Sequence, residues 1–451
     1  MLTPKRFLSL ALPLLSLTTA LDIDTSKPDS LKAVAKTLAG GIIATYNKYQ
    51  TEENPGPGLF SDSGDPYYWY QGGLTFNSLI SYAHLTGDKQ YNAAIAQALT
   101  HQVGDFNAFM PANQTKTLGN DDQSTWGLAA LTAAETGLEN PKGLNVTWLD
   151  LAKAVFNTQV VRWDTEKCNG GLKWQIFTFN QGYNYKNSPS NSQFFLLAAR
   201  LAQITGNQNK TYVEWAEKSY QWANAIGLVS NYTVYDGTDD KANCSQINRI
   251  QWSSSHGAYT EGSAILYNLT SGAQTWKDAV TGFYKSGSVF RSNETGVLFE
   301  VACERNGKCD VDQRAFKGIA ARSLARAALY APIIAGDVRK TLEATAKAAA
   351  AGCSGDGQNL KCAHRWVGGD ADARTVSVNG LGEATNALEV VQGLLYTEAK
   401  LGNGTSSQSP AASGTPTGSA TPTEKTGAAP KMVVAWGGVT IAGMVAAAGL
   451  L

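Results

Sequence analysis

Two adjacent carboxylates, Asp121 and Asp122, are the residues of this chain whose types and spacing best suit chemistry. They lie within residues 119–127, where Asn120 is placed to cap a helix and Gln123 to complete a capping box. Because adjacent helical side chains point about 100° apart, we expect the two carboxyl groups to stand roughly 5–6 Å apart, as in a retaining glycosidase. The helix dipole alone also favours acidic residues in a first turn, so the pair gains meaning only from its surroundings.

Aromatic and polar side chains near this stretch, and near the starts of other helices, are candidate sugar-binding groups. Aromatic rings stack on the C–H faces of sugars, and amides hydrogen-bond to hydroxyls. Core packing or capping of the residue's own helix explains each of them equally well, and a role for Glu261 as an extra acid is weaker than its structural explanation. The predicted substrate-binding set comprises Trp69, Tyr70, Gln71, Asn120, Gln123, Trp126, Trp174, Asn191, His256 and Glu261.

The N-terminus and the cysteines predict secretion. Lys5 and Arg6 precede a short apolar stretch that ends at Ala20, which indicates a signal peptide over residues 1–20. Six cysteines in an oxidising compartment imply disulfides. The natural local pairs are Cys303 with Cys309 and Cys353 with Cys362, which leaves Cys168 with Cys244. Other pairings stay open.

A zinc site at Cys353, Cys362 and His364 is a weak alternative, because its spacing fits no common zinc module. We expect neither a metal nor a cofactor, since the chain has no phosphate-binding glycine loop and no metal cage. Eight Asn-x-Ser/Thr sequons predict a glycosylated surface.

The C-terminus predicts a lipid anchor. Residues 402–430 are rich in Ser, Thr, Pro, Ala and Gly, and residues 431–451 form a hydrophobic tail with no basic residue after it. Small residues near positions 418–420 suit attachment of a GPI anchor, after which the tail would be removed. A simple tail anchor is the alternative, although such helices usually carry a cytoplasmic basic flank.

Composition favours a neutral ligand. The 37 basic and 37 acidic residues balance, and no basic run stands out, which argues against nucleic acid or an anionic membrane surface as a partner. Only 16% of residues are charged, whereas 10% are aromatic. Such a surface suits sugars. Separately, we expect the protein to act as a monomer.

Residues 21–401 predict one catalytic domain built from helix pairs. Six segments rich in small and apolar residues begin near Gln71, Asp122, Asn191, His256, Asp312 and Asn379. Six more amphipathic helices accompany them, at residues 31–49, 89–109, 147–163, 210–226, 274–290 and 337–350. The pattern predicts an all-α (α/α)6 barrel with six inner and six outer helices, whose inner helix starts converge on a concave site. An open α-solenoid is the structural alternative, and strand-like alternation is confined to short pieces such as residues 172–179.

The chain resembles glycoside hydrolase family 76, the endo-α-1,6-mannanases, and among them the GPI-anchored fungal cell-wall members. The resemblance spans residues 22–401. It is carried by the motifs at residues 68–73 (YWYQGG), 119–123 (GNDDQ), 168–172 (CNGGL), 252–262 (WSSSHGAYTEG) and 379–383 (NGLGE).

The resemblance implies an (α/α)6 barrel and a retaining double displacement, with Asp121 as nucleophile and Asp122 as general acid/base. It further implies cleavage of α-1,6-linked mannose in GPI-anchor glycans or mannan, with β-glucan as a possible acceptor. The protein would then lie at the outer face of the plasma membrane or in the cell wall. Two other functions stay open: a wall-polysaccharide-binding protein without turnover, and a different (α/α)6 glycoside hydrolase.

Overall fold

The computed structural model describes residues 20–50, 56–60, 67–206, 209–368 and 380–396. Most of the predicted signal peptide, the linker at residues 402–430 with positions 418–420, and the tail at residues 431–451 lie outside the described residues. Asn379, the predicted start of the sixth inner helix, also lies outside them. In the described part of the chain, no helix combines the length and apolar character needed to cross a membrane.

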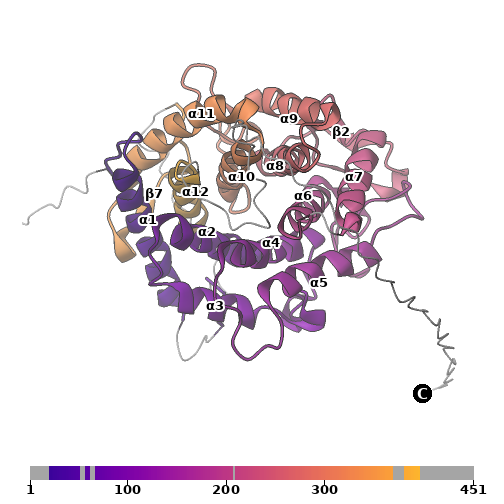
Figure 1. The fold of residues 1–451 in the computed structure, drawn as a ribbon, viewed down its shortest axis with the longest axis horizontal. Coiled ribbons are helices and arrows are strands. Elements are labelled where there is room, and N and C mark those ends of the chain that lie inside the picture. Colours follow the sequence, from indigo (N-terminus) through magenta and orange to yellow (C-terminus); the bar gives the residue numbers. More distant parts are fainter. Residues whose placement is uncertain (1–19, 51–55, 61–66, 207–208, 369–379, 397–451) are drawn as a thin grey trace, which may run out of the picture. The chain divides into compact units, whose positions relative to one another are not determined.

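Six helices form an inner ring (Figure 1). They are α2 (Tyr70–Thr86), α4 (Asn120–Thr136), α6 (Ser188–Ile204), α8 (Ser253–Leu269), α10 (Phe316–Tyr330) and α12 (Leu381–Gly393). Each packs on the next, and α12 packs back on α2. This closure rules out the open solenoid. Small residues allow the close packing, as where Gly73 lies against the ring of Trp126.

Six outer helices surround this ring. They are α1 (Pro28–Tyr49), α3 (Asn92–His101), α5 (Trp148–Val161), α7 (Lys210–Ala225), α9 (Gln274–Ser286) and α11 (Pro332–Ala351). The predicted (α/α)6 architecture is therefore confirmed. Helix α3 ends well before the predicted residue 109, because Phe106, Asn107 and Phe109 have positive φ angles that a helix cannot contain.

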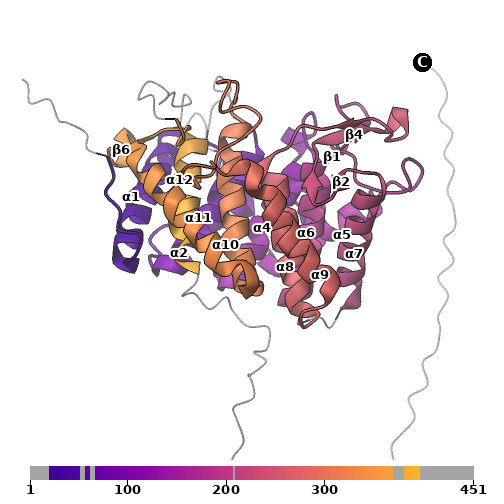
Figure 2. The ribbon, with the colours of Figure 1, turned by 90° about the horizontal axis from the view of Figure 1, so that it is seen from above.

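Short strands and 3₁₀ turns lie in the connections between outer and inner helices, and Figure 2 shows β1, β4 and β6 toward one end of the barrel. Antiparallel pairing joins β1 (Tyr185–Asn187) to β4 (Gly237–Asp239), β4 to β5 (Ile247–Asn248), β2 (Val229–Ser230) to β3 (Thr233–Val234), and β6 (Cys353–Ser354) to β7 (Lys361–Cys362). The 3₁₀ turns are η1 (Asp105–Asn107), η2 (Ala112–Gln114), η3 (Asp240–Ala242), η4 (Gly287–Phe290), η5 (Gln313–Ala315) and η6 (Gly357–Asn359). The piece at residues 172–179 forms only an isolated bridge, between Gln175 and Gly119.

The three disulfides have the pairing favoured by the sequence. They join Cys168 to Cys244, Cys303 to Cys309, and Cys353 to Cys362. The last bond removes both thiolates that the zinc alternative would need.

Candidate active site

The carboxylate pair begins helix α4, but the helix starts in a different register from the predicted one. Gly119, not Asn120, is the N-cap residue, and Asp122 Oδ2 accepts the Gly119 N–H at 2.7 Å. Asp122 therefore occupies the capping-box position predicted for Gln123. The Gln123 side chain instead turns into the interior, where it donates to the Ala108 carbonyl.

A glycine lets the two carboxylates approach each other. A Cβ atom built on Gly119 would lie 2.2 Å from Asp121 Oδ1, 3.0 Å from Asp122 Oδ2 and 3.2 Å from Trp174 Nε1. Asp121 Oδ1 and Asp122 Oδ2 therefore both lie close to the position of this Cβ atom. The distance between the two oxygens can be no longer than the sum of the first two distances. That limit on the distance between the two oxygens is compatible with the gap of about 5–5.5 Å between the carboxyl groups of retaining glycosidases.

The two carboxyl groups differ in their hydrogen-bond partners and in the charges near them, and both affect which group is protonated. Asp121 Oδ2 accepts a hydrogen bond of 2.8 Å from the Asn187 side-chain amide, which favours its ionised form. Burial raises the pKa of Asp121 to about 7, against this hydrogen bond. Burial and then the charge of Asp121 raise the pKa of Asp122 well above its ordinary value. The Asn187 hydrogen bond favours an ionised Asp121, and the charge of Asp121 favours a protonated Asp122, against the hydrogen bond from the Gly119 N–H.

Trp174 forms an exposed wall beside the pair. Its carbonyl accepts the Asn120 N–H at 2.8 Å, which ties the segment that follows α5 to the start of α4. Gly182 lies under the indole ring with a φ angle of +89°, and a Cβ atom there would overlap the ring. Trp174 is 37% exposed, so part of its side chain is accessible to a ligand.

Three of the predicted sugar-binding amides hold backbone segments around the pair. Asn120 donates to the Lys173 carbonyl at 2.9 Å. Asn191 both accepts from the Leu172 N–H and donates to its carbonyl. The Gln71 side chain accepts the N–H of Tyr68, two residues before α2. All three side chains are buried, so their contacts position the site and do not line it.

Three other predicted residues pack in the interior. Trp126 has no exposed surface, and its ring stacks between Trp69 and Phe109 at 5.2 and 5.9 Å. The Trp69 indole donates to Gln102, and Gln123 is fully buried. The prediction that Trp69, Gln123 and Trp126 contact substrate is corrected, because neighbouring side chains cover them.

The prediction that His256 and Glu261, on α8, contact substrate is also corrected, because neighbouring side chains cover both of them. The His256 ring lies edge-on to Phe283 and Phe290 and hydrogen-bonds to the Ser286 hydroxyl. Burial lowers its pKa to about 3, so the ring stays neutral. Glu261 is 1% exposed and pairs with Arg326 at 2.6 Å. Both side chains are parts of the barrel interior.

Two residues of the site were not among the predicted set. Asn187 caps α6 and reaches Asp121, and Asp312 accepts a hydrogen bond from the Tyr70 hydroxyl at 2.6 Å. The sequence carries a signal for the first, because Asn187 directly precedes a Ser-Pro helix start. Of the predicted residues, the structure brings Asp121, Asp122, Tyr70 and Trp174 together.

Gly119→Ala should lower kcat by roughly 10²-fold, because its Cβ atom would push the Asp121 carboxylate out of place. Backbone strain is not the cause, since φ −94° and ψ 160° suit any residue. Kinetics with a mannooligosaccharide and a thermal unfolding curve check this result. Gly336→Ala is the control, because open space surrounds that position. An unchanged kcat in Gly119→Ala would contradict the placement of Asp121.

Asn187→Ser should move the acidic limb of the kcat/KM pH profile to higher pH. Serine keeps a helix cap but loses the amide that stabilises ionised Asp121, so the pKa of Asp121 rises. The expected shift is about 0.5–1 pH unit. A pH–rate series on both proteins measures it, and an acidic limb that stays in place would show that Asn187 serves only as a cap.

Comparison with known proteins agrees with the geometry. The glycosyl hydrolase family 76 profile matches residues 30–406. Mannan endo-1,6-alpha-mannosidase DCW1 of Saccharomyces cerevisiae is 41% identical over 377 residues, 83% of this chain and 81% of the relative. The protein of the same name from Eremothecium gossypii is 39% identical over 402 residues, 87% of this chain and 86% of the relative.

Solved structures share the fold. Dfg5 from Chaetomium thermophilum, solved in complex with glucosamine, has a TM-score of 0.77 and 38% identity, covering 84% of this chain and 93% of its own. The GH76A alpha-1,6-mannanase from Salegentibacter sp. HEL1_6 has a TM-score of 0.59 at 21% identity, covering 80% of this chain and 98% of its own. The extent of the family match and the identity to these fungal relatives show that the chain belongs to glycosyl hydrolase family 76.

Proposed function

We propose that the protein is a retaining endo-α-1,6-mannosidase and transglycosidase, with Asp121 as nucleophile and Asp122 as general acid/base. The observation that carries this proposal is the carboxylate pair at Gly119, whose two oxygens flank one point. Asp121 accepts hydrogen bonds from the Asn187 amide and the Asp122 N–H, whereas Asp122 accepts one from the Gly119 N–H, and this difference supports an ionised Asp121 as the nucleophile.

The reaction follows from these positions. Ionised Asp121 attacks the anomeric carbon while Asp122 gives its proton to the departing glycosidic oxygen, which forms a glycosyl ester on Asp121. Asp122 then takes a proton from the incoming hydroxyl, which attacks the same carbon and releases Asp121. Water as the incoming group gives hydrolysis, and a sugar hydroxyl gives transfer. The partly exposed Trp174 and Tyr70 are the proposed sugar contacts.

The donor is an α-1,6-linked mannose of a GPI-anchor glycan or of mannan, and β-glucan is the acceptor. The fungal relatives are named as mannan endo-1,6-alpha-mannosidases, which supports a mannose-containing donor. The glucosamine complex of the Chaetomium thermophilum protein shows that a relative binds an amino sugar. Transfer to glucan would link GPI glycoproteins to the cell wall, a step of cell-wall biogenesis. The protein would act as a monomer, secreted and held by its own GPI anchor at the plasma membrane or in the wall.

The test uses secreted protein ending at Leu401, incubated with an α-1,6-mannooligosaccharide that carries a GPI-type core. Each reaction is run with and without a laminari-oligosaccharide acceptor, and mass spectrometry identifies the products. A mannosyl–glucan product that depends on both Asp121 and Asp122 supports the transferase. Hydrolysis alone reduces the proposal to a mannanase. Binding without any product favours the wall-binding alternative, and activity that survives both substitutions favours a different glycosidase mechanism.

A further inference from the structure

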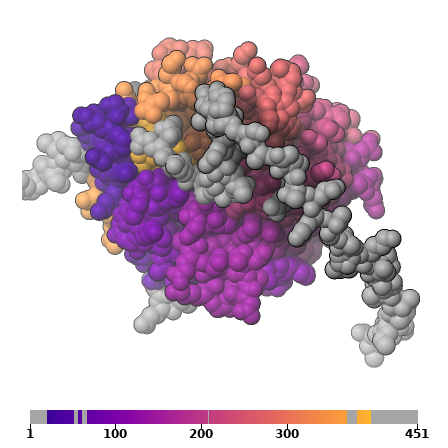
Figure 3. Space-filling model, in the orientation of Figure 1, coloured from indigo at the N-terminus to yellow at the C-terminus, as the bar shows by residue number. Residues whose placement is uncertain are grey.

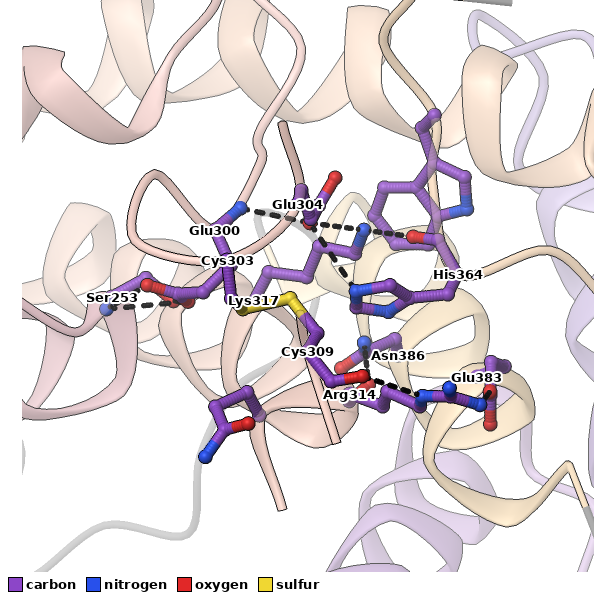
Figure 4. A network of polar contacts seen from close by, with 12 residues as sticks. Ser253, Glu300, Cys303, Glu304, Cys309, Arg314, Lys317, His364, Glu383 and Asn386 are labelled. Carbon is purple, nitrogen blue, oxygen red and sulfur yellow. Dashed lines mark hydrogen bonds and ion pairs between the residues drawn. A yellow bond between two sulfur atoms is a disulfide. The ribbon is translucent and has the colours of Figure 1, made fainter. Parts of the chain in front are cut away.

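The connection between α9 and α10 is anchored by a buried polar network (Figure 4). The Glu300 carboxylate accepts from the N–H and hydroxyl of Ser253, the first residue of α8. Glu304 accepts the Glu300 N–H at 2.8 Å and pairs with Lys317 at 2.7 Å. Lys317, in the first turn of α10, is fully buried and also donates to the His364 carbonyl. One end of this connection is therefore attached to two inner helices.

The other end of the same segment is equally held. The Cys303–Cys309 disulfide closes it, and the Cys309 carbonyl accepts a hydrogen bond of 3.3 Å from Arg314 Nε. Arg314 pairs with Glu383 of α12, and the Arg314 carbonyl accepts from Asn386 of the same helix. Figure 4 shows these side chains meeting between α10 and α12. The residues between Cys309 and Arg314 are thus fixed relative to the inner ring.

Asp312 lies in this fixed stretch and reaches the site. Its Oδ1 atom accepts the Tyr70 hydroxyl at 2.6 Å, and its carbonyl lies 3.3 Å from the same hydroxyl. Gln71 donates to the neighbouring Val311 carbonyl at 3.4 Å. Tyr70 begins α2, so the loop and α2 meet at the mouth of the barrel. Besides burial and the charge of Asp312, the charges of Asp122 and Asp121 raise the pKa of Tyr70, which places its hydroxyl within their field.

The charged and titratable groups around Asp312 in the described residues come from several elements. Tyr70 and Tyr68 face it from α2 and the residues before it, and the catalytic pair from α4. On its own loop, Asp310 Oδ1 accepts the Asp312 N–H at 3.0 Å. Arg314 follows two residues later and pairs with Glu383 of α12.

We propose that Asp312, held by the Tyr70 hydroxyl in the stretch between the Cys303–Cys309 disulfide and Arg314, is a positioning residue that sets the protonation of the catalytic pair through its negative charge. This inference rests on the proposed glycosidase function. The third carboxylate stays outside the bond-breaking steps. Its part is to keep Asp122 protonated, and so able to act as an acid, at pH values where an isolated carboxylic acid would be ionised.

The electrostatics give the sign of the effect. The charge of Asp312 raises the pKa of both Asp121 and Asp122, because a neighbouring negative charge disfavours ionisation. Burial raises the pKa of Asp312 itself to about 6, and the Tyr70 hydrogen bond opposes that rise. Asp312 is therefore charged at neutral pH and above, where the acid needs support. Its effect fades as the pH falls through about 6.

The experiment compares the pH profile of kcat/KM for wild type, Asp312→Asn and Tyr70→Phe, with full-length protein and an α-1,6-mannooligosaccharide. Removing the charge lowers the pKa of both catalytic groups, so both limbs of the Asp312→Asn profile should move to lower pH by about 0.5–1 unit. On the basic limb this corresponds to a loss of roughly three- to tenfold in rate. Tyr70→Phe removes the hydrogen bond that lowers the pKa of Asp312, and should move the limbs in the same direction.

Asp310→Asn is the matched control, because it removes one charge from the same loop at an exposed position and keeps an acceptor for the Asp312 N–H. Its limbs should not move to lower pH, because the charge of Asp310 raises the pKa of Asp312 and its removal keeps Asp312 ionised. The double variant Tyr70→Phe/Asp312→Asn should shift no further than Asp312→Asn. Unshifted limbs in Asp312→Asn, or a lower rate at every pH without a shift, would overturn the inference.

A wild type without any turnover would contradict the proposed function but still leave the inference testable. In that case, NMR titration of protein labelled at the aspartate carboxyl carbons measures the pKa of Asp121 and Asp122 directly. Both should fall in Asp312→Asn. Equal values in wild type and variant would refute the charge effect whatever the activity.

Discussion

Asp121→Ala should lower kcat by about 10⁴-fold or more, because it removes the carboxylate that we propose forms the glycosyl ester. Asp122→Ala should cost about 10²- to 10⁴-fold, the usual contribution of a general acid/base. The loss in Asp122→Ala should be smaller with an activated leaving group, because such a group departs without needing a proton. Steady-state kinetics with natural and activated mannosides measure both effects.

Azide separates the two roles. In Asp121→Ala, azide can take the place of the missing nucleophile and should give a β-mannosyl azide of inverted configuration. In Asp122→Ala, azide should intercept the glycosyl-enzyme and give an α-mannosyl azide of retained configuration. Products of the opposite configuration in the two variants would reverse the assignment.

A capping residue of another helix supplies the matched control for both variants. Asp150 accepts the Thr147 N–H at the start of α5, as Asp122 accepts the Gly119 N–H at the start of α4. Asp150→Ala should therefore lose a comparable cap but keep full activity. A similar loss of activity in all three variants would mean that Asp121 and Asp122 serve only the helix.

Arg326→Met should destabilise the protein by about 3–5 kcal/mol, the cost of leaving a buried charge without its partner. Arg326 is 1% exposed and pairs with Glu261 at 2.6 Å and with Glu135 at 2.9 Å. Arg200 also binds Glu135, so Glu261 is the carboxylate that would have no ion pair among the residues that the structure describes. Urea unfolding of both proteins measures the difference in the free energy of unfolding.

Two further variants separate this stabilising role from catalysis. Lys340→Met removes an exposed ion pair with Asp337 on α11 and should leave the free energy of unfolding almost unchanged. Glu261→Gln should lower stability while its folded fraction keeps the wild-type kcat. A lower kcat of the folded Glu261→Gln protein would instead indicate that Glu261 takes part in catalysis.

The fold was predictable because its signals are local. Runs of small residues mark the inner helices and amphipathic periodicity marks the outer ones, and both repeat six times in alternation. The end of α3 was not predictable in this way, because the positive φ angles at Phe106 and Phe109 occur at residues that rarely adopt them.

The site was only partly predictable, because its remaining contacts are long-range. The pair itself is a local motif, but Asn187 meets Asp121 across 66 residues and Asp312 meets Tyr70 across 242. No periodicity carries such information. Trp126 was wrongly predicted to contact substrate. An aromatic residue beside such a motif belongs to the core as often as to a ligand-binding surface, and only the rings of Trp69 and Phe109 stacked on its two sides show that it belongs to the core.

Trapping of the covalent intermediate tests the central claim, that Asp121 attacks the sugar, most directly. The protein is incubated with a fluorinated mannosyl donor whose second step is slow, digested, and analysed by peptide mass spectrometry. We predict one mannosyl adduct, on Asp121, that is absent from Asp121→Asn and still forms with an activated donor in Asp122→Asn. An adduct on Asp122, or turnover to a product of inverted configuration without any adduct, would contradict the account.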